Sequence, residues 1–488
     1  MPAATPIRRL PELLKSIFIL CAVLIAIAAV VLPGLRLVRA TRLWPAALLI
    51  VTAPLEVYRS SSGAGLNVSV FRLALAVGVA ALAVDVLRGR KKFTGVVAVP
   101  FVIYAGLLAW QLISLLFVTA NHSLAYRLLG QYGAGLVAAF VITCYVERRD
   151  LRVLAGLCSA AAVLPLVAGA YRVFSVSGGG SGDLPGLSEL PLNLAIEAAR
   201  QGGSSLLNGT QRLNATFADP NQFGFYIGTA FLVLLGAACS ALFFEKRIVW
   251  RTATSYILLA VSAGVAIVGT YSRGAWVLAA VGVAVLAALL GRPFWTRQRT
   301  IAGCIVGVIA LGLASPLIIS RLGSSEPGNL KSTQVHTHTM SIAFKLVAHH
   351  PLTGVGLGGY GRYDNQPLLI SSAVSTFLTV TAELGVPGLM LLVAAVVATS
   401  VAAVRSVLRS PVADRALLAG FVAAFIGLVV GNIVGEVWMN DFQWVLFGSL
   451  IAVTSQRRLA LGSVWLRIRR AIDSRSPPTP SEQTQVAA

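Results

Sequence analysis

Residues 376–404, TFLTVTAELGVPGLMLLVAAVVATSVAAV, form an apolar run with a single charged side chain, Glu383. A helix needs about 20 apolar residues to cross the hydrocarbon core of a bilayer, and this run is longer than that. Comparable runs occupy residues 16–35, 68–87, 95–119, 124–146, 151–175, 219–244, 252–270, 273–290, 300–320 and 414–435. The sequence therefore predicts an all-α, polytopic integral membrane protein.

Two further apolar runs, 43–57 and 442–454, are short for a straight crossing. The first also contains Pro45 and Pro54, which interrupt a regular helix. With these runs counted as marginal, we predict about twelve transmembrane helices, within a range of about eleven to thirteen.

The composition agrees with lipid as the solvent of this chain. Of its 488 residues, 57% are hydrophobic, and its mean hydropathy is +0.81. The formal net charge of +21 would suggest nucleic acid as the partner of a soluble protein. Here the basic residues mainly punctuate the gaps between apolar runs, so most of them are topology determinants and no nucleic-acid partner is expected.

Short basic loops set the predicted orientation. They lie at 88–92, 148–149, 246–247, 292–299 and 405–415, and basic residues recur after residue 456. The positive-inside rule places these loops and the C-terminus in the cytoplasm. Two long loops, 176–218 and 321–375, then face outward, the second of them partly helical. Basic residues on both sides of run 16–35 conflict with this scheme, so we expect the segment 43–57 to be re-entrant or only partly inserted.

One membrane domain, residues 1–472, accounts for nearly the whole chain, and a short Pro/Ser-rich tail, 473–488, is predicted to be disordered. The five cysteines lie inside apolar segments without metal-ligand spacing, so neither disulfides nor zinc are expected. No pattern in the sequence indicates another metal or a cofactor. The cysteines are Cys21, Cys144, Cys158, Cys239 and Cys304.

The first long loop ends in QRLNATFADPN, residues 211–221. Asp219 and Asn221 suit the start of a helix, where their side chains can cap the span that follows. Arg212 lies just outside the bilayer and could hold an anionic headgroup through paired hydrogen bonds. The simpler alternative is an interfacial arginine bound to ordinary lipid phosphate.

A second signal is TYSRGAW, residues 270–276, which joins two apolar runs with almost no loop. Arg273 must therefore lie at or within the outer membrane surface. A charge in that position costs a few kcal/mol unless it is paired or faces a cavity, and the positive-inside rule disfavours it. We interpret Arg273 as a functional residue.

The second long loop holds four of the five histidines. His336 and His338 precede a helix-like stretch, 340–348, and could accept a proton from a hydroxyl nucleophile at neutral pH. His349 and His350 stand at the end of that stretch, where the helix dipole alone would favour them. The turn that follows, TGVGLGGY at 353–360, could let backbone amides approach phosphate, although glycine-rich turns are widespread. Lys331 and Arg362 add cations nearby.

Four motifs in this order resemble the O-antigen ligase and O-antigen polymerase superfamily of bacterial membrane glycosyltransferases. They are Arg212 with FADPN at 217–221, SRGA at 272–275, HPLTGVG at 350–356, and ELGVPGL at 383–389. The resemblance covers about residues 205–455. It implies an enzyme that uses undecaprenyl-diphosphate-linked glycans outside the inner membrane, in cell-envelope polysaccharide biosynthesis. Its partners would be a lipid-linked oligosaccharide donor and a glycan or glycolipid acceptor, with any biosynthetic-complex partners left open.

The resemblance assigns the lipid diphosphate to Arg212 and Arg273, and we add Arg362, with Asn221 and His350 in support. Ligases of this superfamily usually carry a catalytic histidine between the glycine turn and the ELG segment. This chain has Ser371–Ser375 there, which favours a polymerase-like or divergent member. His338 or His336 is the candidate base in its place. Glycosyl transfer without a metal is expected, because a diphosphate leaving group needs only charge stabilisation.

The alternative function is a transporter or flippase for a lipid-linked or anionic substrate. Transporters often show inverted repeats and broken helices near the membrane midplane. This sequence shows no obvious matching of its halves, and its charges collect at one face, so the transferase is the preferred hypothesis.

Overall fold

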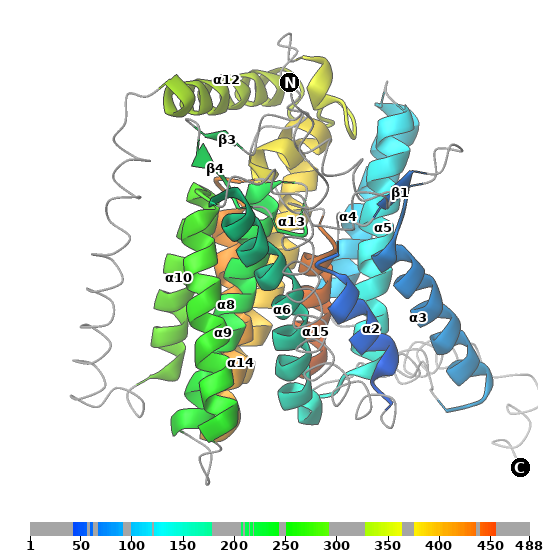
Figure 1. Ribbon diagram of the computed structural model, residues 1–488. Coiled ribbons are helices and arrows are strands. Elements are labelled where there is room, and N and C mark those ends of the chain that lie inside the picture. Colours follow the sequence, from blue (N-terminus) through cyan, green and yellow to red (C-terminus); the bar gives the residue numbers. More distant parts are fainter. Residues whose placement is uncertain are drawn as a thin grey trace, which may run out of the picture.

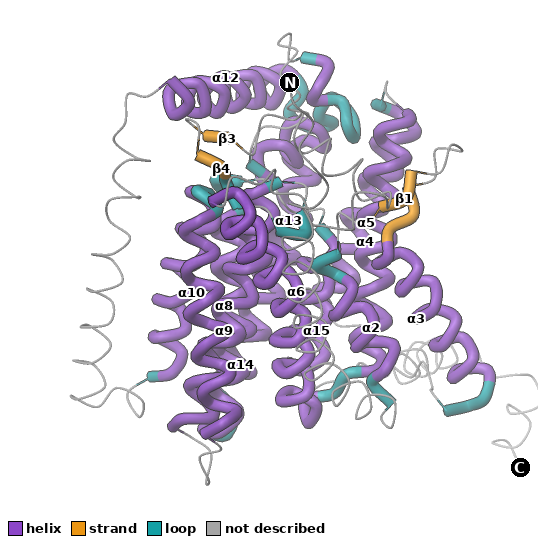
Figure 2. Tube along the Cα trace, viewed as in Figure 1, coloured by secondary structure: helices purple, strands orange, loops and turns teal. Residues whose placement is uncertain are grey.

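The computed structural model describes residues 42–55, 59–61, 67–90, 99–119, 122–177, 206–207, 210–213, 215–217, 219–243, 250–291, 327–363, 375–435 and 440–454. These residues form twelve α-helices and two small antiparallel hairpins (Figures 1 and 2). One hairpin pairs β1 (Arg59–Ser61) with β2 (Asn67–Ser69), and the other pairs β3 (Leu206–Leu207) with β4 (Thr210–Gln211). The predicted runs 16–35 and 300–320 and the predicted tail lie outside the described residues.

Nine of the described helices are long and apolar enough to cross a membrane. Each coincides with a predicted run, which confirms a multi-pass helical membrane protein, while the total of about twelve crossings stays a prediction. They are α3 (Val70–Leu87), α4 (Val99–Phe117), α5 (His122–Tyr145), α6 (Leu151–Ser177), α8 (Pro220–Phe243), α9 (Trp250–Gly269), α10 (Arg273–Leu290), α13 (Thr376–Leu408) and α14 (Val412–Gly431).

Three more helices complete the described part of the chain. The two marginal runs form α2 (Trp44–Thr52) and α15 (Asp441–Thr454). At 1.5 Å per residue, the 9 residues of α2 are too short for a roughly 30 Å core, which fits partial insertion. The last helix, α12 (Pro327–His349), is the polar one and lies across the top of the bundle in Figure 1.

The bundle has two distinct ends. The segments of both long loops that the structure describes, β3, β4 and α12, lie at the top in Figure 1. We call this the outer end, after the predicted sidedness of the two loops. The opposite end carries basic turns that were predicted to be cytoplasmic. There the Arg148 guanidinium, between α5 and α6, donates a hydrogen bond to Ser410 Oγ, between α13 and α14. These two basic turns therefore lie at the same end of the bundle, while the side of the membrane that they face stays a prediction.

Glycines bring three central helices into close contact. A Cβ on Gly236 of α8 would lie 2.7 Å from the Cα of Gly420 on α14. A Cβ on Gly427 of α14 would lie 2.6 Å from the carbonyl oxygen of Leu278 on α10. Small residues at helix contacts are typical of membrane bundles, because lipid supplies no hydrophobic force between helices and close packing must hold them together. The packed group α8, α10 and α14 supports the outer-end segments described below.

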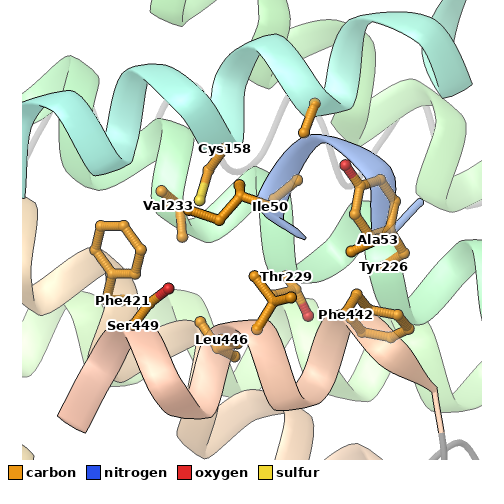
Figure 3. A pocket seen from close by; sticks show the side chains of 13 residues that line it. Ile50, Ala53, Cys158, Tyr226, Thr229, Val233, Phe421, Phe442, Leu446 and Ser449 are labelled. Carbon is orange, nitrogen blue, oxygen red and sulfur yellow. The ribbon is translucent and has the colours of Figure 1, made fainter. Parts of the chain in front are cut away.

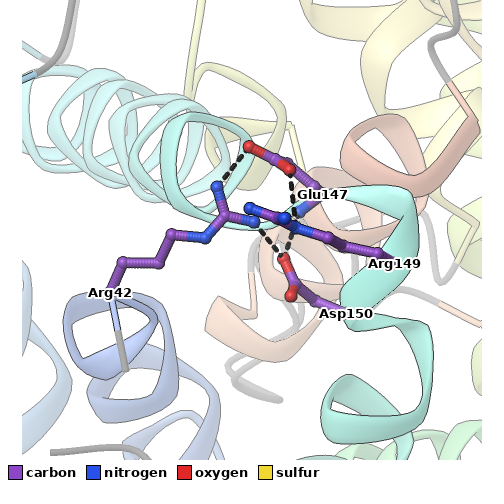
Figure 4. A network of polar contacts seen from close by, with 4 residues as sticks. All are labelled: Arg42, Glu147, Arg149 and Asp150. Carbon is purple, nitrogen blue, oxygen red and sulfur yellow. Dashed lines mark hydrogen bonds and ion pairs between the residues drawn. The ribbon is translucent and has the colours of Figure 1, made fainter. Parts of the chain in front are cut away.

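A polar network anchors α2 at the opposite end (Figure 4). The Arg42 guanidinium pairs with Glu147 and, over 3.0 Å, with Asp150, both in the turn between α5 and α6. The hydrogen bond to Glu147 raises the pKa of Arg42, against a smaller opposing effect of burial. Glu147 also forms an ion pair with Arg149 over 3.0 Å. The start of α2 is therefore tied to the end at which the basic loops collect.

We expect Arg42→Met to lower the unfolding free energy by only about 1 kcal/mol, because the network is partly open to water. The Arg42 side chain is 33% exposed. Arg90→Met is the matched control, since Arg90 is 67% exposed and lies 3.9 Å from its Asp85 partner. Thermal unfolding of both variants in detergent checks this, and an Arg42 effect no larger than that of Arg90 would contradict it.

Candidate functional site

Arg212 is buried at the outer end, where three segments meet. It follows β4, is 8% exposed, and its Nε donates to the Thr270 carbonyl oxygen over 2.9 Å. Its Nη2 donates to Asn221 Oδ1 over 2.8 Å. The next amide, that of Leu213, donates to the Gly269 carbonyl oxygen over 3.0 Å. Arg212 thus joins the end of α9 to the first turn of α8.

Arg273 begins α10 directly after the turn that Arg212 holds. Ser272 caps this helix by accepting a hydrogen bond from the Ala275 amide. Arg273 itself is partly exposed. The helix dipole disfavours a cation at an N-terminus and favours an anion there. The N-terminus of α10 and the Arg273 guanidinium therefore place positive charge side by side.

Backbone strain concentrates around the same two segments. In the described part of the chain, the positive φ values of non-glycine residues are those of Ala215, 47°, and Tyr271, 52°. Ala215 follows Arg212 in sequence, and Tyr271 lies between Thr270 and the cap of α10. Such a conformation costs of order 1–3 kcal/mol and tends to occur at functional sites. The strain supports a site around Arg212 and Arg273.

Burial lowers the pKa of Arg212, and the nearby charge of Asp219 partly offsets this. An arginine guanidinium is not deprotonated in proteins, so Arg212 carries its positive charge at neutral pH. Asp219 itself has a local role, because its Oδ1 accepts hydrogen bonds from the amides of Asn221 and Gln222. The capping interpretation of Asp219 is confirmed. Asn221 has a second role, because its side chain also accepts from Arg212.

The glycine-rich turn at 353–360 is structural. Its amides are used inside the protein: Val355 donates to Ala382, Gly356 donates to Glu383, and Leu357 donates to Ser114 Oγ. Because these amides already have acceptors, the turn does not offer them to a phosphate. This observation removes the alternative in which the backbone amides of the turn approach phosphate.

Close packing explains why this turn contains glycine. Gly354 has a φ of 64°, and a Cβ there would lie 2.3 Å from the carbonyl carbon of Glu383. Gly385 has a φ of 69° at the kink in α13, and a Cβ there would lie 2.4 Å from the Leu352 carbonyl oxygen. The buried Glu383 carboxylate accepts the Tyr360 amide over 3.4 Å. The turn and the kinked helix therefore form one interlocked unit.

The candidate histidines lie on α12. This helix begins at Pro327, so His336 and His338 are within it and do not precede it, which corrects the predicted helix start. His336 is half-buried and His338 is exposed. The start was predicted wrongly because this long polar helix has no strong apolar periodicity. Its stability comes from tertiary packing, in which Ala343 and Leu346 contact residues outside the helix, namely Tyr360 and Ala382.

The remaining predicted residues surround the end of α12. His349 is its last residue, as the dipole argument expected, and His350 is exposed, with its carbonyl oxygen accepting from the Gly354 amide. Arg362 is exposed in the short 3₁₀ turn Tyr360–Arg362. The site residues thus form two groups at the outer end. Arg212, Asn221 and Arg273 make the first, which we call the arginine site, and the α12 histidines with Arg362 make the second.

An apolar pocket lies deeper in the bundle (Figure 3). It has a volume of about 40 Å³, and its lining comes from α2, α6, α8, α14 and α15, including Tyr226, Phe442 and Ser449. Ser449 Oγ is buried there without a hydrogen-bond partner among the described residues. A volume of that size suits on the order of one water molecule. No charged side chain lines the pocket, so it is not a site for a diphosphate.

Sequence reasoning missed the Thr270 carbonyl and Tyr271 as parts of the arginine site. A backbone carbonyl leaves no mark in a sequence, and nothing local predicted the positive φ of a tyrosine. The cysteines of the described residues, Cys144, Cys158 and Cys239, form no disulfide with one another.

The fold and the arginine site define a multi-pass helical membrane protein with a cationic site at one end of the bundle. Comparison with known families adds a match over part of the chain. Residues 256–393 match the family described as O-antigen ligase. This match over part of the chain supports the family resemblance and a glycosyltransferase-like role in the cell envelope. No curated protein matches the chain.

Proposed function

We propose that this protein is a glycosyltransferase that polymerises or ligates undecaprenyl-diphosphate-linked oligosaccharide units. The reaction takes place on the outer face of the bacterial cytoplasmic membrane. The observation that carries the proposal is the arginine site. Arg273 lies within the matched family domain, and Arg212, outside it in sequence, is joined to the same turn through the Thr270 carbonyl.

In the proposed reaction, an acceptor sugar hydroxyl attacks the anomeric carbon of the lipid-linked sugar. A new glycosidic C–O bond forms while the C–O bond to the diphosphate breaks, and undecaprenyl diphosphate leaves with the bonding electrons. The positive charge of Arg273, reinforced by Arg212, stabilises the leaving diphosphate without a metal. Arg362 adds positive charge on the exposed turn after the glycine-rich segment.

The hydroxyl proton needs an acceptor, and we propose His338, or His336 beside it, as the base. An imidazole has its reference pKa near neutral pH and can take this proton. Both residues lie on α12, which crosses the outer end of the bundle (Figure 1). The helix would then face the glycan, while the arginine site holds the lipid diphosphate.

We expect the His338→Ala, His336→Ala double variant to transfer glycan about 10²–10⁴-fold more slowly, the usual contribution of a general base. Ser341→Ala on the same exposed helix is the matched control, because Ser341 bonds only locally to the His338 carbonyl oxygen. The measurement is the rate of product formation by purified protein. Full activity of the double variant would remove these histidines from the mechanism.

Reconstitution tests the function as a whole. Purified protein in liposomes receives a prenyl-diphosphate-linked oligosaccharide, and both the released prenyl diphosphate and the new glycosidic bond are measured. A transferase produces both in equal amounts. A transporter or flippase instead moves the intact lipid-linked sugar across the bilayer with no bond broken, and that outcome would replace the proposal.

A further inference from the structure

The two arginines of the proposed function are held in different ways. Arg212 is 8% exposed, and its guanidinium is engaged by the Thr270 carbonyl and the Asn221 side chain. Arg273 is partly exposed at the start of α10. A diphosphate reaches a partly exposed guanidinium directly, whereas it would have to displace the packed surroundings of Arg212.

The bond from Arg212 to the Thr270 carbonyl fixes a particular peptide plane. The carbonyl of Thr270 and the amide of Tyr271 belong to one planar unit, so holding the carbonyl restricts the ψ of Thr270 and the φ of Tyr271 together. Tyr271 has a φ of 52°, in the left-handed region that a tyrosine adopts only under constraint. The Arg212 guanidinium supplies such a constraint.

The turn is also confined by α8. Thr270 is 0% and Ser272 is 2% exposed. A Cβ on Gly224 would lie 2.8 Å from the Ala275 Cβ and 3.0 Å from the Thr270 Oγ1, so the first turns of α8 pack directly against this segment. Arg212 and α8 together hold the strained turn, and Arg273 comes two residues after Tyr271.

We infer that Arg212 is a positioning residue. It holds the Thr270–Tyr271 peptide, keeps Tyr271 left-handed, and so directs Arg273 toward the lipid diphosphate, which Arg273 binds. Asn221 completes the arrangement by holding the other side of the Arg212 guanidinium. The inference rests on the proposed function for the identity of the ligand, but the link from Arg212 to the turn is a property of the fold alone.

Glycine at position 271 separates a positioning role from direct binding. Glycine adopts a positive φ about as readily as a negative one, so it restores the native turn without Arg212. Alanine removes the same side chain but keeps the steric restriction. The variants are Arg212→Ala, Arg212→Ala with Tyr271→Gly, and Arg212→Ala with Tyr271→Ala. Arg273→Ala with Tyr271→Gly shows whether glycine alone creates binding.

The probe is farnesyl diphosphate, titrated into each purified variant in lipid nanodiscs, with the thermal midpoint of each variant recorded in parallel. We expect Arg212→Ala to weaken binding by about tenfold or more, as loss of a conformation strained by this amount implies. In the Arg212→Ala background, Tyr271→Gly should restore most of the lost binding and Tyr271→Ala should restore none. The Arg273→Ala, Tyr271→Gly variant should bind farnesyl diphosphate weakly. The thermal midpoints should follow the same order for the three Arg212 variants.

The inference is overturned if Tyr271→Gly restores neither the binding nor the thermal midpoint of the Arg212→Ala variant. Arg212 would then be a direct ligand. If the wild-type protein binds no farnesyl diphosphate while glycine still restores the midpoint lost by Arg212→Ala, the proposed function fails and the positioning role stands. Arg212→Lys gives a second check that keeps the charge. Lysine cannot reproduce the planar guanidinium fork between Thr270 and Asn221, so its binding should be as weak as that of alanine.

Discussion

Arg273→Ala should lower glycosyl transfer by roughly 10²–10³-fold, the usual loss when one group that stabilises transition-state charge is removed. The reason is the position of Arg273, a partly exposed guanidinium on the first turn of α10 at the outer end. In the proposed reaction its positive charge stabilises most of the negative charge that develops on the leaving diphosphate. Arg273→Lys should retain part of the rate, because it keeps the charge but loses paired hydrogen bonding.

Arg251→Ala is the matched control for this prediction. Arg251 is exposed in the first turn of α9, the helix that precedes the Arg273 turn, but it lies at the opposite end of that helix. The measurement follows lipid-linked oligosaccharides and polymer length in cells. Repeat units should accumulate on the lipid at the outer face for Arg273→Ala only. Accumulation at the cytoplasmic face would indicate a flippase, and unchanged glycans would contradict both functions.

Gly354→Ala should lower the free energy of unfolding by more than about 4 kcal/mol. Only a few mechanisms produce a loss of this size. Two of them act together here. The φ of 64° is unfavourable for alanine, and its Cβ would lie 2.3 Å from the Glu383 carbonyl carbon and 2.4 Å from the oxygen. These are backbone atoms in the kinked part of α13, so no side-chain rotation relieves the contact. We expect the turn to separate from α13, and α12 to lose its packing with it.

Gly156→Ala offers the same chemical change without either penalty. Gly156 lies inside α6, and apart from the adjacent backbone of that helix no heavy atom lies within 4 Å of the position its Cβ would occupy. Alanine is a better helix former than glycine, by about 1 kcal/mol, so this variant should be neutral or slightly more stable. Thermal unfolding and limited proteolysis of α12 compare the two. Equal midpoints for both variants would show that the interlocked turn is not essential to the fold.

Much of the fold could be predicted because crossing a membrane depends on local composition. Each of the nine long apolar helices, α13 among them, appears in the sequence as an apolar run long enough to cross a bilayer. The Asp219 cap was predictable for the same reason, since its partners lie within three residues. Arg273 stood out because a cation between two adjoining apolar runs must be near the membrane surface.

The start of α12 and the role of the glycine turn could not be predicted in this way. Residues 327–339 carry little apolar periodicity, and the helix depends on packing of Ala343 and Leu346 against residues from other segments. The turn looked available to phosphate because glycine permits a close approach to backbone. Only the positions of Ser114, Ala382 and Glu383 reveal that the approaching groups belong to the protein itself.

The sequence by itself determined that this chain is a helical membrane protein, which segments are apolar enough to cross the bilayer, and that Arg212 and Arg273 merit attention. Those conclusions follow from the transfer of side chains between water and lipid, a property each segment has on its own. Only the tertiary structure decided that Arg212 reaches the Thr270 carbonyl, 58 residues away, and that the turn it holds leads into Arg273. That contact depends on how α8, α9 and α10 pack at the outer end, and helix packing is fixed by shape complementarity between distant segments, which no local pattern records.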